Sequence, residues 1–183
     1  MKKITTVTIL AILCLVCVAN LAYAAVDVLL KVNGINGESV ISGHEGEIDI
    51  LSWTWQISNP NDALSTYGGG AYPPVINPLI LTKYTDKASP QFAIILLNNS
   101  SIDEAVLTVR KAGKEALDYL KIKMWEVRVI DLTSGVSGGE DRVAETVALD
   151  FSRVCYEYTP QKDDGTADAS IEKCWDISAN VPY

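Results

Sequence analysis

His44 is the one histidine of the chain and the residue best suited to acid–base catalysis or metal binding. A Ser-His-Asp triad, a Cys-His pair or a three-ligand zinc site would each have to use it. The run from His44 to Glu47 lacks the second histidine of the zinc pattern His-Glu-x-x-His, and its neighbours are typical of a solvated turn. We therefore predict no catalytic residue, no metal site and no cofactor. A hydrolase that depends on His44 is the weakest of our hypotheses.

Clustered carboxylates and glycines do not have the spacing of a known site. Asp163, Asp164 and Asp168 lie around Gly165 in a weak resemblance to a calcium loop. The alternating oxygen ligands and the closing glutamate of an EF-hand are missing. The glycine run at 68–70 is not followed by Lys-Ser or Lys-Thr, as a phosphate-binding loop requires. We interpret these segments as solvated turns and loops.

The chain is acidic, with a formal net charge of −8 at pH 7. An acidic surface repels phosphate backbones and anionic lipid headgroups. We therefore expect neither nucleic acid nor a membrane surface as a partner.

The N-terminus has the layout of a secretory signal peptide. Lys2 and Lys3 precede an apolar run at 9–18, and Ala22-Tyr23-Ala24 places small residues before a cut between Ala24 and Ala25. The apolar run is shorter than the roughly 20 residues that span a bilayer, which disfavours a transmembrane anchor. The sequence therefore predicts cleavage after Ala24.

Lipidation at Cys17 is an alternative to this cleavage. It is disfavoured because Val16 is bulkier than the small residue expected before a lipidated cysteine, and because it leaves Ala22-Tyr23-Ala24 unexplained. We predict a signal peptide over 1–24 and one domain over 25–183. The protein is then secreted or periplasmic, and it is cytoplasmic before secretion if the signal peptide is absent.

Cys155 and Cys174 are the two cysteines that follow the signal segment. Two cysteines in an exported chain suggest a disulfide bond. Both positions are equally distant from Asp164-Gly165, a dipeptide that favours tight hairpin turns. A hairpin centred there would place Cys155 opposite Cys174. Two free, buried thiols are the alternative.

Period-two alternation of apolar and polar residues predicts a mainly β protein. The predicted strands cover residues 26–32, 48–58, 79–84, 105–110, 119–130, 146–158 and 171–177. In 119–130 and 146–158 the alternation changes phase, which indicates a β-bulge or a strand that moves between two packing surfaces. Residues 59–77 form the one long loop, which we expect to be mobile or to act as a contact arm.

One helix is predicted at about 90–98. Ser89 can cap its first turn, and Pro90 suits the first helical position. Its apolar positions form a wide stripe that a sheet or a neighbouring subunit must cover: Phe92, Ile94, Ile95, Leu96 and Leu97.

Trp53, Thr54 and Trp55 alternate along a predicted strand. The two indoles therefore lie on one face, which we assign to the core or to an interface, and Thr54 lies on an aqueous face.

Short motifs in this order resemble the haemolysin-coregulated protein (Hcp) family, the tube subunits of bacterial type VI secretion systems. The motifs span nearly all of residues 26–181: LKV at 30–32, GES at 37–39, EIDILSWTW at 47–55, TKYTDKASP at 82–90, VRKAG at 109–113, YLKI at 119–122, GGEDR at 138–142 and YTPQK at 158–162.

The resemblance implies a compact antiparallel β-barrel of two sheets with one flanking helix, without enzymatic activity. It implies homo-hexameric rings that stack into a tube, whose lumen carries small effector proteins and which works with other secretion components. Thr54 would face the lumen, and loops 33–47 and 59–77 would lie at ring or subunit contacts. The signal peptide and the cysteine pair depart from the family and indicate an exported relative. The alternative function is a secreted monomeric carrier or adhesin that binds through loop 59–77.

Overall fold

The computed structural model describes residues 26–59, 73–111, 116–136, 138 and 141–183. The predicted signal peptide, its cleavage site between Ala24 and Ala25, and most of loop 59–77 lie outside the described residues. Within the described ranges, no helix is both long enough and apolar enough to cross a membrane.

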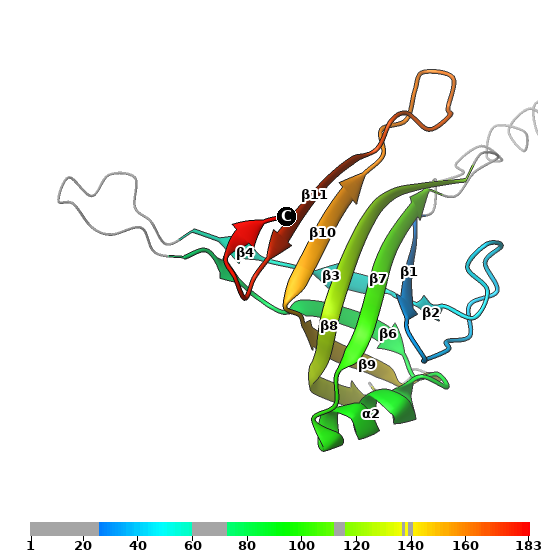
Figure 1. Ribbon diagram of the computed structural model, residues 1–183. Coiled ribbons are helices and arrows are strands. Elements are labelled where there is room, and N and C mark those ends of the chain that lie inside the picture. Colours follow the sequence, from blue (N-terminus) through cyan, green and yellow to red (C-terminus); the bar gives the residue numbers. More distant parts are fainter. Residues whose placement is uncertain (1–25, 60–72, 112–115, 137, 139–140) are drawn as a thin grey trace, which may run out of the picture.

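Antiparallel strands make up most of the described chain, as the alternation predicted (Figure 1). The elements in chain order are β1 (Val26–Val32), β2 (Ile48–Asp49), β3 (Ser52–Thr54), β4 (Ile57–Ser58), β5 (Val75–Ile76), β6 (Leu79–Tyr84), α2 (Ser89–Asn98), β7 (Ile102–Lys111), β8 (Leu117–Gly135), β9 (Ala144–Asp150), β10 (Arg153–Tyr158), β11 (Ile171–Asp176) and β12 (Val181–Pro182).

Two sheets share the long strand β8. One has the order β12-β11-β10-β8-β7-β1-β2, the other runs through β3, β6, β9 and β8, and β4 pairs separately with β5. The predicted class, two antiparallel sheets with one flanking helix, is confirmed. The strand ladders do not close into a complete barrel over the described residues. Instead the chain passes from β2 to β3, where Ile50 N–H donates to Val28 O at 2.9 Å and Leu51 N–H to Thr82 O at 2.7 Å.

The phase change predicted in 119–130 occurs where β8 passes from one sheet to the other. Its first part pairs with β7 and β10, and its last part pairs with β9. Buried side chains alternate up to Met124 and again from Val127, and Glu126 lies between these two runs. Its φ is +54°, a value that few residues other than glycine adopt. The local backbone turn restarts the alternation, so Val127 and Val129 are buried on the new surface.

The phase change predicted in 146–158 is a corner between strands. β9 ends at Asp150 in the second sheet, and β10 begins at Arg153 in the first. Tyr156 and Tyr158 continue the apolar alternation of the predicted strand 146–158, which assigns them to its buried face, but they are 44% and 46% exposed. The alternation therefore located the corner but misassigned the side chains that follow it.

The helix begins one residue earlier than predicted, and Ser89 does not cap it. Ala88 occupies the cap position without a side-chain hydrogen bond, and the Asp86 carboxylate accepts from Ala88 N–H at 3.0 Å. Ser89 lies inside the first turn because its hydroxyl has buried partners, accepting from Lys83 Nζ at 2.9 Å and donating to Glu145 at 2.5 Å. Phe92 anchors the helix in the core and is fully buried.

A buried ion pair joins β6 and β9 of the second sheet to the helix. Lys83 on β6 and Glu145 on β9 are opposite each other in the ladder, with Nζ 3.1 Å from Oε2. Lys83 Nζ also lies 2.8 Å from Asp86 Oδ1 and 2.8 Å from Tyr84 O. The polar groups are thus paired, as burial requires.

Candidate functional site

The tryptophans of β3 and its extension pack inward, and the threonine between them is exposed. Trp53 and Trp55 are partly buried against the core. Trp55 Nε1 donates to Asn77 O at 3.0 Å, and its ring centroid lies 5.8 Å from that of Phe151. Thr54 lies on the opposite, exposed face of the strand. This placement agrees with the alternation, and the lumen-facing role of Thr54 stays a prediction.

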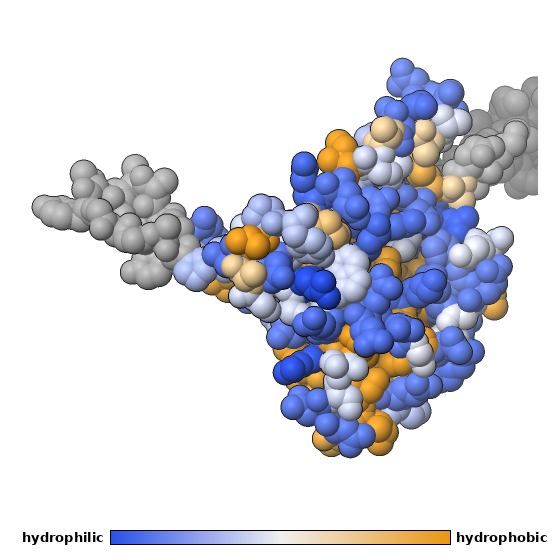
Figure 2. Space-filling model, viewed as in Figure 1, coloured by the Kyte–Doolittle hydropathy of each residue, from blue (hydrophilic) through white to orange (hydrophobic). Residues whose placement is uncertain are grey.

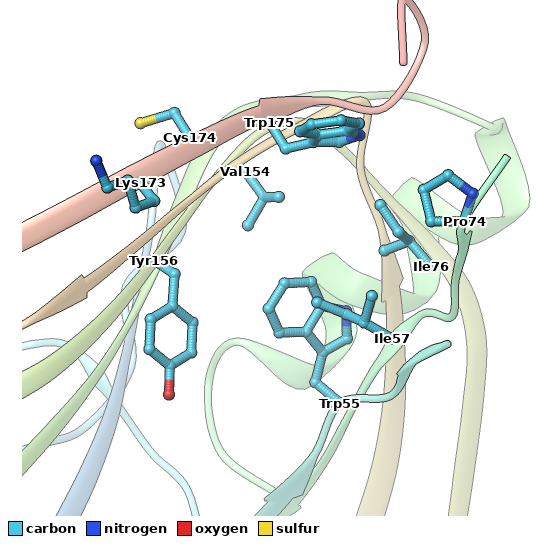
Figure 3. Close-up of a pocket in the computed structure, with 9 residues that line it drawn as sticks. All are labelled: Trp55, Ile57, Pro74, Ile76, Val154, Tyr156, Lys173, Cys174 and Trp175. Atoms are coloured by element: carbon cyan, nitrogen blue, oxygen red, sulfur yellow. The ribbon is translucent and has the colours of Figure 1, made fainter. Parts of the chain in front are cut away.

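An apolar groove of ≈ 440 Å³ lies between the β3–β5 segment and the β10–β11 hairpin. Figure 3 shows side chains from the first segment facing side chains from the second across it. Its lining has one charged residue and is otherwise almost entirely apolar: Trp55, Ile57, Pro74, Ile76, Val154, Tyr156, Lys173, Cys174 and Trp175. The indole N–H of Trp175 is buried and has no hydrogen-bond partner among the described residues. A buried donor without an acceptor costs free energy.

The apolar–polar pattern does not indicate this groove, because its walls come from segments about a hundred positions apart, Trp55–Ile57 and Val154–Trp175. Alternation predicts which side of a strand is apolar, not which other strand faces it.

A second apolar surface lies on the outward side of α2. Ile94 is 56% exposed and Leu97 is 78% exposed, and the helix contains no charged residue. Figure 2 shows a mostly hydrophilic face with hydrophobic side chains gathered near the end where α2 lies. The predicted apolar stripe is therefore covered by the sheets only at Phe92 and, in part, at Ile95 and Leu96.

Cys155 and Cys174 are directly opposite each other in the β10–β11 ladder, in the register that the sequence predicted. Their sulfur atoms lie at disulfide distance, and their Cα atoms are 4.0 Å apart. Cys155 is 4% exposed, and the Tyr183 hydroxyl lies 3.7 Å from its sulfur.

The turn of this hairpin differs from the predicted two-residue form. Lys162 N–H donates to Thr166 O at 2.9 Å, so three residues, Asp163 to Gly165, form the tip. Gly165 has a φ of +88°, which glycine adopts without strain. The Thr166 hydroxyl and N–H lower the pKa of the Asp164 carboxyl. Asp164 thus stabilises the turn, as the turn interpretation of this acidic cluster predicted.

Charged residues surround the cysteine pair on the same face of the sheet. Lys123 Nζ on β8 lies 2.7 Å from Glu157 and 2.8 Å from Glu172. Hydrogen bonds to Glu157, and to a smaller extent to Glu172, raise the pKa of the Lys123 ammonium.

The neighbours of His44 form an exposed turn, as predicted, but the His44 side chain itself is buried, which the sequence did not indicate. Its side chain is 10% exposed, with Nδ1 2.9 Å from Glu47 Oε2 and Nε2 3.2 Å from Asp118 Oδ1. Arg110 donates to Ser42 O at 2.7 Å in the same region. The sequence could not show this, because Asp118 is 74 positions away along the chain. His44 Nε2 thus joins loop 33–47 to the start of β8, Arg110 joins the loop to the end of β7, and His44 Nδ1 bonds within the loop.

Comparison with known proteins places these features in a family. A sequence model described as "Type VI secretion system effector, Hcp" matches residues 29–158. Protein hcp1 of Pseudomonas aeruginosa is 40% identical over 159 residues, which cover 86% of this chain and 98% of that protein.

Solved structures agree with this result. A type six secretion system protein superimposes with a TM-score of 0.81 at 25% identity, covering 87% of this chain and 100% of the other. Hcp1 from Salmonella typhimurium gives 0.72 at 32% identity, covering 87% and 99%. A type VI secretion system effector from Yersinia pestis gives 0.68 at 26% identity, covering 82% and 100%.

Proposed function

The chain belongs to the Hcp family of type VI secretion proteins, and we propose that it is a non-enzymatic structural subunit of homo-hexameric rings that stack into a tube. The observation that carries this proposal is the match to a curated Hcp protein over 98% of that protein's length. This match supports the single domain that we assign to residues 25–183.

We further propose that a neighbouring copy covers the apolar groove in the ring. Copies of a chain with a net charge of −8 repel one another unless they meet through surfaces without carboxylates. The groove has that property, since Lys173 is its one charged residue. The outward side of α2, which is uncharged, is the second contact surface. A head-to-tail ring needs two different surfaces of this kind on each subunit.

The lumen of the ring is the proposed place for small effector proteins, and Thr54 is the proposed lumen-facing residue of β3. Its exposure on the face opposite the tryptophans supports this assignment. We propose that loops 33–47 and 59–77 contact neighbouring subunits or rings.

Export by a signal peptide cut between Ala24 and Ala25 would distinguish this chain from a subunit assembled in the cytoplasm. The cysteine pair supports an oxidising destination, because disulfides persist outside the cytosol. Intact-mass measurement of cytoplasmic, periplasmic and medium fractions, with and without reductant, tests both points. A full-length, reduced cytoplasmic species as the stable product would refute export.

Native mass spectrometry tests the ring. We expect a six-fold mass for the unchanged protein, and monomers for Tyr156→Glu in the groove and Leu97→Glu on α2. Both side chains are exposed in the single chain, so these variants should keep the fold. Val136→Glu is the matched control, since Val136 is 60% exposed and lies outside both surfaces. A monomer at all concentrations would favour the carrier or adhesin, for which the open groove and the signal sequence are the supporting observations.

A further inference from the structure

The cysteine pair belongs to a cluster of three side chains that can coordinate a metal ion. One ligand atom each from Cys155, Glu172 and Cys174 lies within 4.8 Å of the others, and no second such cluster occurs in the described part of the chain. Thiolate and carboxylate oxygen are ligands of Zn²⁺, and two thiolates favour soft cations such as Zn²⁺ and Cd²⁺ over Mg²⁺ or Ca²⁺.

The hairpin holds these ligands in place before any ion arrives. Cys155 is the ladder partner of Cys174, and Glu172 is two residues from Cys174, so all three side chains lie on one face. Opposite strands fix their spacing, because β10 is also paired with β8 on its other side. Ligands on a paired strand lose less conformational freedom on binding than ligands on a loop.

A coordination position remains open beside the cluster. A recess of ≈ 420 Å³ is lined by Glu172, Cys174 and the C-terminal Tyr183, among others. The Tyr183 hydroxyl lies 3.7 Å from Cys155 Sγ. Water can therefore reach the cluster and complete a four-coordinate site, in which three protein ligands leave one position for solvent.

We propose that the dithiol form of the chain binds one Zn²⁺ ion through Cys155, Cys174 and Glu172, and that the disulfide form does not. A small-molecule dithiol reduces the disulfide, giving two protein thiols and the oxidised cyclic disulfide of the reagent. Zn²⁺ binding then releases the two thiol protons. Glu172 exchanges its contact with Lys123 for the ion, and Lys123 keeps its contact at 2.7 Å with Glu157. Binding and disulfide formation exclude each other, since both use the same two sulfurs. The inference is independent of ring formation.

Titration of the reduced protein with Cd²⁺ under anaerobic conditions tests the proposal, because cadmium thiolates have an ultraviolet charge-transfer band. We expect one Cd²⁺ per chain, displacement by Zn²⁺, and no band in the oxidised protein. Cys174→Ser should lower the affinity at least about 100-fold. Glu172→Gln should lower it about 10-fold while the thiolate band persists. Asp168→Asn is the matched control, as a carboxylate of the same hairpin outside the cluster.

Reduced protein that binds Cd²⁺ no more tightly than a Cys155→Ser, Cys174→Ser double variant would overturn the site. An unchanged affinity in Glu172→Gln would overturn the role of the carboxylate as third ligand. The oxidised, unmutated protein serves as a folded reference, so loss of binding there cannot be attributed to unfolding.

Discussion

Replacing Lys83 with methionine should be among the most damaging single substitutions in the described chain. Lys83 is 1% exposed, and its ammonium lies within 3.1 Å of Glu145 and 2.8 Å of Asp86. Methionine keeps most of the side-chain volume but removes the positive charge. The Glu145 carboxylate, 5% exposed, then stays in the core without its counter-charge. Breaking a buried pair in this way costs about 3–5 kcal/mol in the free energy of unfolding.

The penalty should depend on pH in a defined direction. Burial raises the pKa of the Glu145 carboxyl, but hydrogen bonds from Ser89, Lys83 and Thr85 outweigh it, so the pKa lies below the ordinary glutamate value. A lowered pKa stabilises the fold above the pKa of the unfolded chain, about 4.3, and this stabilisation is lost as the pH falls through the folded-state pKa. In Lys83→Met, protonation of Glu145 relieves an unpaired charge instead. The difference between the two proteins should therefore shrink as the solution is acidified.

Urea unfolding monitored by tryptophan fluorescence measures this difference at pH 7, 5 and 4. The Tyr156→Glu variant is a suitable background, since an assembled ring would add subunit contacts to the measured stability. A Lys83→Met, Glu145→Leu double variant should recover part of the loss, because it removes the buried Glu145 charge and leaves only Asp86 without its ion-pair partner. A penalty below about 1 kcal/mol at pH 7, or one that stays constant down to pH 4, would refute the reasoning.

Three further substitutions test other parts of the structure. Cys174→Ser should cost about 3 kcal/mol under oxidising conditions and little in the presence of reductant, measured by urea unfolding, because the cross-link to Cys155 closes a loop of 19 positions. His44→Ala should cost about 1–3 kcal/mol and speed amide hydrogen exchange in loop 33–47, since it removes contacts with two carboxylates. Phe92→Ala should cost about 3–5 kcal/mol in a thermal melt, because the fully buried ring leaves a cavity between helix and sheets.

The sequence predicted what depends on local pattern and symmetry. The equal spacing of Cys155 and Cys174 around Asp164-Gly165 predicted that the two cysteines lie opposite each other, as they do. The pairing nearer the tip, Gln161 with Ala167, is offset by one position from that symmetry because the turn has three residues. The phase change in 119–130 located the passage of β8 between the two sheets, because a strand that changes surface must restart its alternation.

Local sequence patterns could not predict which residues far apart in the chain lie next to each other. Lys83 and Glu145 are charged residues, and a charged residue alone indicates an exposed position. Their burial follows from the β6–β9 register, which joins positions 62 apart. The burial of His44 was missed for the same reason, because its partner Asp118 lies 74 positions away. The prediction that Ser89 caps the helix was wrong, because its hydroxyl bonds to Lys83 and Glu145 in the core instead of to the backbone of the first turn.

The ladder between β1 and β7 bears on how fast the protein folds. It pairs Val26 with Lys111, so the first strand has only the short β2 as a partner until much of the chain has been synthesised. Folds dominated by such distant pairings form slowly, in about milliseconds to seconds, because a large loop must close before any contact stabilises it. A polypeptide that folds late stays unfolded for longer, and an unfolded chain can pass through a narrow membrane channel. This chain would thereby be suited to crossing a membrane unfolded, behind its predicted signal peptide, and to gaining its tertiary structure on the far side.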